Sequence, residues 1–152
     1  MTLQGPTSNS FISQRLKLHY ADWGNPDAPP LLLVHGGRDH CRSWDWVAEE
    51  LRRDWHIIAP DLRGHGDSAW SPDGNYEMAS FVYDLAQLIH QSGLAPVTIV
   101  AHSMGTMVTV EALRLHFEAV ADASPVPVYL YSVPAFTALP WPPGLAEALA
   151  PH

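Results

Sequence analysis

One serine in this 152-residue chain stands in a setting that could make it a nucleophile. Ser103 lies in Ala101-His102-Ser103-Met104-Gly105, with a small residue two positions before it and another two positions after it. A β-branched run over 96–100 precedes the serine and helical spacing follows it, which predicts a sharp turn from a strand to a helix. Small neighbours suit such a turn because its strained backbone leaves little room. The same five residues are also typical of a serine that caps a helix, so the pattern alone leaves both interpretations open.

Two further junctions between a strand and a loop lie upstream. The apolar run 31–34 is typical of a strand buried on both faces, and it ends in His35-Gly36-Gly37-Arg38. A second apolar run, over 55–60, leads into Asp61-Leu62-Arg63-Gly64-His65-Gly66-Asp67-Ser68. The chain resembles the α/β-hydrolase family over about residues 16 to 117. The resemblance rests on the order of its parts, which is a strand, the His-Gly loop, a helix, a strand, the D-x-R-G-x-G-x-S loop, a helix, a strand and the serine turn.

This resemblance implies a nucleophile elbow at Ser103 and an oxyanion hole made of two backbone N–H groups. One N–H belongs to Met104, at the start of a helix whose dipole favours an anion. The other belongs to Gly37, where glycine lets the backbone approach a substrate closely. The implied activity is hydrolysis of a small ester or related acyl compound through an acyl-serine intermediate, with no cofactor.

Other chemistries of the family fit this sequence to different degrees. Haloalkane dehalogenases and epoxide hydrolases use an aspartate nucleophile, and they are disfavoured because a serine holds position 103. Carbon–carbon bond hydrolases and cofactor-free haloperoxidases also use serine and stay open. A different class also stays open, namely a non-catalytic module that binds a small ligand or a partner above Gly37 and Ser103.

A serine nucleophile needs a histidine base and an orienting carboxylate, and in this family both follow the serine. The candidates downstream of Ser103 are His116, His152, Glu111, Glu118, Asp122 and Glu147. Asp122 and His152 follow Ser103 in the expected order of acid and then base. However, the helix after Ser103 runs back about 20 Å at 1.5 Å per residue, so Asp122 would lie near the opposite edge of the sheet from Ser103. His102 is disfavoured because neighbours at a sharp turn diverge, and His35 because we expect it to fix its own loop. No triad acid or base is identified, so whether this chain is itself an active enzyme stays open.

The segment 64–69 also matches the G-x-G-x-x-G/A pattern of dinucleotide-binding loops. That interpretation requires a helix directly after the pattern, whereas Ser71-Pro72-Asp73-Gly74 follows, and Asp67 would set a carboxylate where a pyrophosphate lies. We therefore predict a structural loop, in which Arg63 and Asp67 could be partners and His65 is an ordinary loop histidine.

The elements that must position these residues follow from periodicity. Residues 1–10 are expected to form a loose leader, and 16–23 alternate as a half-exposed edge strand does. Helices are predicted over 43–51 with Trp44, Val47 and Leu51 facing the core, over 78–89 with Gly93 as its stop, and from Met104 to about Phe117. Strands that alternate with helices predict an α/β fold with a mostly parallel sheet and helices on both faces.

The composition changes after residue 122, where six of the fourteen prolines fall between Pro125 and Pro143. A sixth, buried strand is still predicted over 127–131, after which the fold is apparently truncated. The domain prediction is a partial α/β-hydrolase core over 1–134, followed over 135–152 by the start of a cap or lid or by a disordered tail. Because the strand 127–131 would be uncovered, we expect self-association through this sheet edge.

Charge and cysteine content narrow the partners. Eight basic against sixteen acidic residues give a net charge of −8, which argues against nucleic acid and favours a soluble protein with a small-molecule substrate. Cys41 is the single cysteine, so no intrachain disulfide can form, and no ligand cluster surrounds it in the sequence, so no metal site is predicted. No targeting signal and no apolar run of about 18 residues is visible. A cytoplasmic location without a membrane partner is expected.

Overall fold

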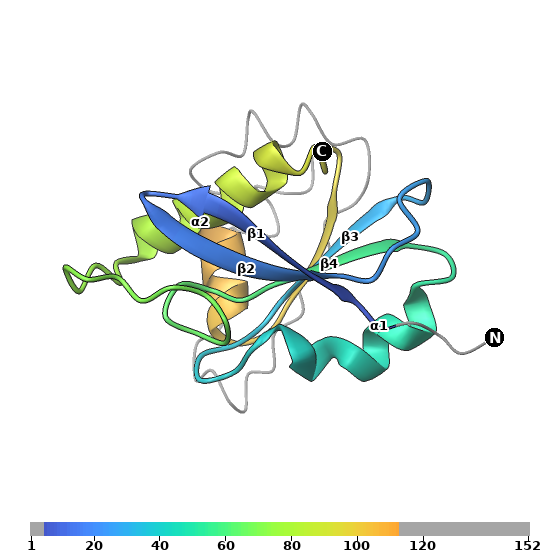
Figure 1. Cartoon of the computed structure of the whole chain (residues 1–152), viewed down its shortest axis with the longest axis horizontal. Coiled ribbons are helices and arrows are strands. Elements are labelled where there is room, and N and C mark those ends of the chain that lie inside the picture. Colours follow the sequence, from blue (N-terminus) through green and yellow to red (C-terminus); the bar gives the residue numbers. More distant parts are fainter. Residues whose placement is uncertain (1–4, 113–152) are drawn as a thin grey trace, which may run out of the picture.

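The structure, a computed structural model, describes residues 5–112 and contains one open five-stranded sheet (Figure 1). The strands are β1 (Thr7–Ser13), β2 (Leu16–Asp22), β3 (Pro30–Val34), β4 (His56–Pro60) and β5 (Thr98–Ala101), in the spatial order β1-β2-β4-β3-β5. β2 is antiparallel to β1 and β4, whereas β3 is parallel to β4 and β5. All strands except β2 therefore run in one direction, and the predicted α/β class with a mostly parallel sheet is confirmed.

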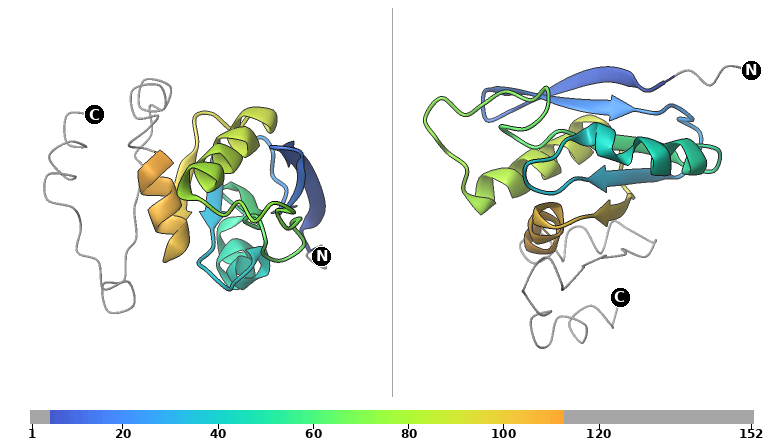
Figure 2. Two further views of the ribbon diagram at one scale, coloured as in Figure 1. Left: turned by 90° about the vertical axis from the view of Figure 1, so that its left-hand side faces the viewer. Right: turned by 90° about the horizontal axis from the view of Figure 1, so that it is seen from below.

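The central strands are buried on both faces because successive side chains alternate between two apolar clusters. The helices are η1 (Cys41–Trp44), α1 (Asp45–Leu51), α2 (Met78–Gln91) and a helix over 104–112. Leu32 and Val34 face the cluster that α2 and the helix over 104–112 complete, and Leu31 and Leu33 face the cluster that α1 completes. Helices thus cover both faces of the sheet, as predicted (Figure 2).

The helices agree with the predicted periodicity except at α1. α2 buries Leu85 and Leu88 and ends before Gly93, whose φ of 62° lets the chain turn away as predicted. At α1, Ala48 is buried and Val47 is exposed, so the prediction that Val47 faces the core is wrong. The reason is η1, a 3₁₀ turn with about three residues per turn, which shifts the phase of the helix that follows. Within residues 5–112, no helix is long and apolar enough to cross a membrane.

The N-terminal segment differs from the prediction. β1 pairs with β2 from Thr7 opposite Asp22 to Ser13 opposite Leu16, so residues 7–10 are a strand and the predicted loose leader is wrong there. β1 is accordingly the edge strand, and β2 lies between β1 and β4. The signal was weak because β1 shows no apolar alternation before Phe11, its first buried residue.

Several predictions fall outside the described residues. These are the strand over 127–131, the uncovered edge it would form, the cap or tail over 135–152, and the carboxylates and histidines beyond residue 112.

Candidate active site

The loops that follow β3 and β5 lie side by side because these strands are parallel neighbours. Val34 and Ala101 are paired at the ends of the two strands, and the His102 amide donates to the Val34 oxygen at 3.0 Å. A Cβ atom on Gly36 would lie 3.0 Å from the Ser103 Cβ and 3.0 Å from the His102 Nδ1. Glycine at position 36 is therefore what allows the two loops to approach this closely.

Ser103 has an unusual backbone conformation at the turn. Its φ of 53° lies in the left-handed region, which residues other than glycine rarely adopt. The helix over 104–112 begins directly after it, and the amides of Gly105 and Thr106 donate to the oxygens of His102 and Ser103 at 2.9 and 3.0 Å. A serine that merely caps a helix has an extended backbone, so the left-handed φ favours the elbow interpretation over the cap.

Gly105 allows the helix after the turn to pack directly on β3. A Cβ atom at this position would overlap the His35 carbonyl oxygen and would lie 2.7 Å from the Val34 oxygen. The Thr109 hydroxyl donates to the Gly105 oxygen at 2.8 Å, within the same turn of helix. The first turn of the helix, and Ser103 with it, is therefore fixed against the carboxyl end of β3.

Gly37 and Met104, the two predicted oxyanion donors, are neighbours at this end of the sheet. A Cβ atom on Gly37 would lie 3.6 Å from the Met104 Sδ and 3.8 Å from its Cβ. Met104 is the first residue of the helix, where backbone amides have no partner within the helix and carry partial positive charge. The structure thus brings Gly37, Ser103 and Met104 together.

His35 fixes the loop after β3, as expected. It is fully buried, its Nδ1 lies 2.6 Å from the Gly36 oxygen, and its Nε2 accepts the Leu62 amide at 3.0 Å. Burial lowers the pKa of His35 and favours the neutral ring. Since both ring nitrogens are engaged, His35 has no lone pair with which to accept a proton from Ser103.

The Ser103 hydroxyl has no hydrogen-bond partner within residues 5–112. His102 is partly exposed beside it, but no hydrogen bond joins the two side chains in this part of the chain. The described residues therefore place Ser103 beside Gly37 and Met104, and none of them is hydrogen-bonded to its hydroxyl as a base.

The loop after β4 is held by a buried ion pair. The Arg63 Nε and Nη2 donate to the two carboxylate oxygens of Asp84 at 2.6 and 2.9 Å, and Nη1 donates to the Asn75 oxygen at 2.9 Å. The Arg63 and Asp84 side chains are 1% and 4% exposed. The suggested pairing of Arg63 with Asp67 is therefore wrong. Asp67 is exposed at the loop surface, whereas α2 turns Asp84 inward beneath Arg63.

Asp61, at the end of β4, is a second anchor of this loop. Its carboxylate accepts the amides of Cys41 at 2.6 Å and Asp67 at 2.9 Å, and it lies 2.8 Å from the His19 Nδ1. Burial by itself would raise the pKa of Asp61, but these hydrogen bonds together lower it below its ordinary value. A Cβ atom on Gly66 would overlap the carboxylate, so glycine is needed there.

The fold also assembles a ligand cluster that the sequence did not reveal. Side-chain atoms of His19, Cys41 and Asp61 lie within 4.8 Å of one another, although they come from β2, η1 and the end of β4. These are donor types that zinc accepts. However, both Asp61 oxygens already accept N–H groups, and burial together with Asp61 raises the pKa of the Cys41 thiol to about 12. A metal ion would have to displace that thiol proton and compete with those hydrogen bonds.

His65 behaves as the ordinary loop histidine that was predicted. Its Nδ1 lies 2.9 Å from the Arg63 oxygen, and its ring centroid is 5.2 Å from that of His35.

Known proteins share this architecture. Residues 29–126 match the family model of the alpha/beta hydrolase fold. The (E)-2-((N-methylformamido)methylene)succinate hydrolase of Acinetobacter baylyi is 32% identical over 99 residues, which are 64% of this chain and 36% of that protein. Epoxide hydrolase 2 of Caenorhabditis elegans is 31% identical over 112 residues, which are 72% of this chain and 31% of that protein.

Among solved structures, an alpha/beta hydrolase from Novosphingobium aromaticivorans superimposes with a TM-score of 0.70 at 26% identity, over 77% of this chain and 42% of that one. The chain spans less than two fifths of the length of the two curated relatives. The match over 29–126 includes the His35 loop, the Asp61 loop and the Ser103 turn, and by this match and this fold the chain belongs to the α/β-hydrolase fold family.

Proposed function

We propose that Ser103 is the nucleophile of a hydrolase that cleaves small esters or related acyl compounds through an acyl-serine intermediate. The observation that carries this proposal is the left-handed φ of 53° at Ser103, next to Gly37 and Met104. A residue in such a conformation costs about 1–3 kcal/mol and persists only where its surroundings impose it. At this turn, Gly105 packs on the carbonyl oxygens of Val34 and His35, and the His102 amide donates to the Val34 oxygen, so the chain is held on both sides of Ser103.

In the proposed reaction the Ser103 Oγ attacks the carbonyl carbon of the ester, and the carbonyl oxygen becomes negatively charged. The N–H groups of Gly37 and Met104 stabilise this oxygen, and a single donor of this kind is worth about 10²–10³ in rate. The alcohol leaves, and water then hydrolyses the acyl-serine. The base and its carboxylate would come from outside residues 5–112, as they do in family members where both follow the serine.

The serine at position 103 supports acyl chemistry over the alternatives with an aspartate nucleophile. An aspartate would form an alkyl ester with an epoxide or haloalkane, whereas a serine forms an acyl ester with a carbonyl compound. The similarity to an epoxide hydrolase therefore supports the shared core and not the same substrate.

A second candidate is a non-catalytic module that binds a small ligand above Gly37 and Ser103. The observation that favours it is the lack of a hydrogen-bonded base for Ser103 within residues 5–112. The two functions differ in whether the Ser103 oxygen forms a covalent bond.

Covalent labelling with a fluorophosphonate, followed by digestion and mass spectrometry, separates them. We expect Ser103 to be labelled about 100 times faster than Ser92, which lies at the C-terminal end of α2, because the backbone donors stabilise the attacked oxygen even without a base. Equal labelling of Ser103 and Ser92 would favour the binding module. The variant Ser92→Ala is a matched control for Ser103→Ala, which should lose only the Ser103 adduct.

A further inference from the structure

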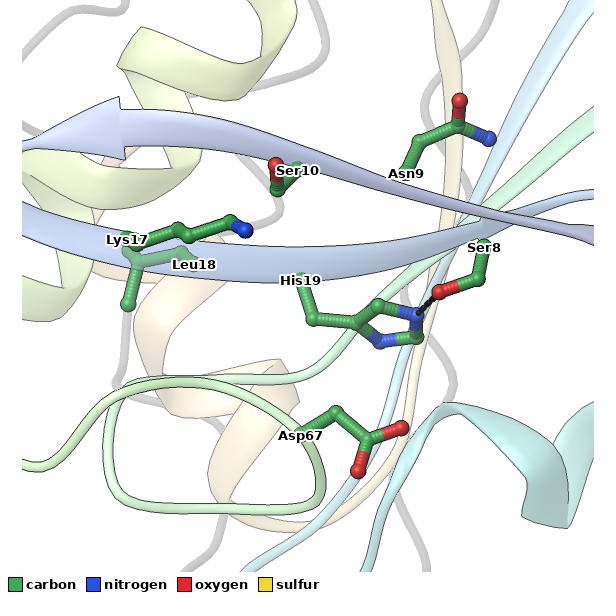
Figure 3. Close-up of a pocket in the computed structure, with 7 residues that line it drawn as sticks. All are labelled: Ser8, Asn9, Ser10, Lys17, Leu18, His19 and Asp67. Atoms are coloured by element: carbon green, nitrogen blue, oxygen red, sulfur yellow. Dashed lines mark hydrogen bonds between the residues drawn. The ribbon is translucent and has the colours of Figure 1, made fainter.

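We infer that Ser8 is a second reactive serine of this chain, activated by His19 and Asp61, which takes small carbonyl esters at a cavity beside the β1–β2 hairpin. The Ser8 Oγ lies 2.8 Å from the His19 Nε2 (Figure 3). On the other side of the ring, the His19 Nδ1 lies 2.8 Å from the Asp61 Oδ2. This is the connectivity of a serine, a base and an orienting carboxylate. It involves none of the residues proposed for the Ser103 reaction.

The hydrogen bonds fix the direction in which a proton can move. A carboxylate only accepts, so in the neutral imidazole the Nδ1 carries the proton and donates it to Asp61. The Nε2 then holds a lone pair, and it accepts the Ser8 O–H at 2.8 Å. Asp61 stays ionised because the amides of Cys41 and Asp67 also donate to it. The Cys41 Sγ, 3.9 Å from the His19 Nδ1, belongs to a thiol that burial keeps protonated.

The arrangement is held by the sheet. Ser8 is opposite Ala21 and Ser10 is opposite His19, so Ser8 reaches the His19 ring diagonally across the β1–β2 pair. The His19 amide donates to the Ser68 hydroxyl at 2.8 Å, and the Asp61 amide donates to the His19 oxygen at 2.9 Å. The imidazole is thus positioned through its backbone and both of its ring nitrogens.

Ser8 is exposed and opens onto a cavity of about 300 Å³, a size that suits a small ligand. Ser10, Lys17 and Asp67 also line this cavity, and Figure 3 shows them around the His19 ring. Lys17 brings a positive charge to the cavity, which favours the negative oxygen that forms when a carbonyl is attacked.

The proposed step balances as follows. The Ser8 Oγ bonds to the carbonyl carbon, and its proton moves to the His19 Nε2. The bond from that carbon to the alkoxy oxygen then breaks, and the departing alcohol takes the proton from Nε2. A water molecule then gives a proton to the same nitrogen while its oxygen bonds to the acyl carbon. The bond from that carbon to the Ser8 Oγ breaks and Oγ takes the proton back from Nε2, so that one ester and one water yield one acid and one alcohol.

A fluorophosphonate tests the activation without knowledge of the natural ester. Its phosphorus bonds to the serine oxygen, fluoride leaves, and the serine proton passes through Nε2 to solvent. Ser10 is the internal control, because it is exposed on the same strand and lines the same cavity. Activation by a general base is worth about 10²–10⁴ in rate, so we expect Ser8 to be labelled at least about 100 times faster than Ser10. Equal rates would overturn the inference and leave the contact between Ser8 and His19 as a purely structural one.

Variants assign the cause. Ser8→Ala should abolish the Ser8 adduct, Ser10→Ala should leave it unchanged, and His19→Gln should slow it to the rate of Ser10. Fast Ser8 labelling that survives in a folded His19→Gln protein would contradict activation by His19. If His19→Gln does not fold, the ratio of the Ser8 and Ser10 labelling rates in the unmodified chain decides whether Ser8 is activated. Labelling of Ser103 is measured on a separate peptide of the same digest, so the proposal for Ser8 and the proposal for Ser103 can each fail without the other.

Discussion

The buried ion pair between Arg63 and Asp84 should be among the most sensitive points of the fold. Both charged groups lie almost wholly out of water, with side-chain exposures of 1% and 4%, and they share two hydrogen bonds of 2.6 and 2.9 Å. The substitution Asp84→Asn keeps the shape of the side chain but removes its charge. The Arg63 guanidinium is then left buried without a counter-charge.

The size of the effect follows from burial. Removing one partner of a buried pair costs about 3–5 kcal/mol because the remaining charge stays desolvated. At about 2–4 °C per kcal/mol for a chain of this length, the melting temperature should fall by about 6–20 °C. The exposed pair of Arg42 and Asp45 is the matched control, with side-chain exposures of 52% and 27%. Asp45→Asn should cost less than about 1 kcal/mol.

The assay is urea unfolding of the unmodified chain, Asp84→Asn and Asp45→Asn, followed by circular dichroism. A third variant, Arg63→Met with Asp84→Leu, removes both charges and should be more stable than Asp84→Asn alone. The reasoning is refuted if Asp84→Asn and Asp45→Asn lose the same small amount of unfolding free energy.

Three further outcomes are expected. Gly105→Ala should lose about 1–3 kcal/mol of unfolding free energy, measured in urea, because the added methyl group overlaps the His35 oxygen. In the control Gly37→Ala the methyl group has contacts of 3.6 Å or more, so this variant should unfold at nearly the same urea concentration as the unmodified chain; equal losses would contradict the packing described. The Cys41 thiol, with its pKa raised to about 12, should be inert to Ellman's reagent at about pH 8 until guanidinium unfolds the chain, and rapid native labelling would disprove its burial. The pKa of Asp61 is lower in the folded chain than in the unfolded chain, so ionised Asp61 should stabilise the fold at about pH 6 and do so less as the pH falls towards 3. The difference in unfolding free energy between the unmodified chain and Asp61→Asn should therefore narrow over this range, and a constant difference would refute the expectation.

The sequence predicted the features that depend on local pattern and on parallel pairing. Continuous apolar runs marked β3 and β4, and the small residues around Ser103 marked its turn. The resemblance to the α/β-hydrolase family implied that the loop with Gly37 lies beside the turn with Ser103. In the structure β3 and β5, which precede them, are parallel neighbours that end at the same edge.

The features that were missed depend on register between distant segments. β1 has a polar face and gave no alternation, so the edge strand and the contact between Ser8 and His19 across the pair were not predicted. Asp84 looked like one more polar residue on α2, and nothing in its spacing pointed to Arg63, 21 positions earlier. The sequence alone does not identify the partner of a buried charged residue, because that partner depends on which loop the residue's helix faces.

The measurement that tests the central claim most directly is the fate of the acyl group when the chain meets p-nitrophenyl acetate. An acid quench during turnover stops hydrolysis of any acyl-Ser103 that has formed, so the adduct can be detected directly. After an acid quench and digestion, mass spectrometry should find acetyl on Ser103 in the unmodified chain and in Ser92→Ala. A Ser103 peptide that stays unmodified while p-nitrophenolate is released would contradict the proposal that Ser103 is the nucleophile.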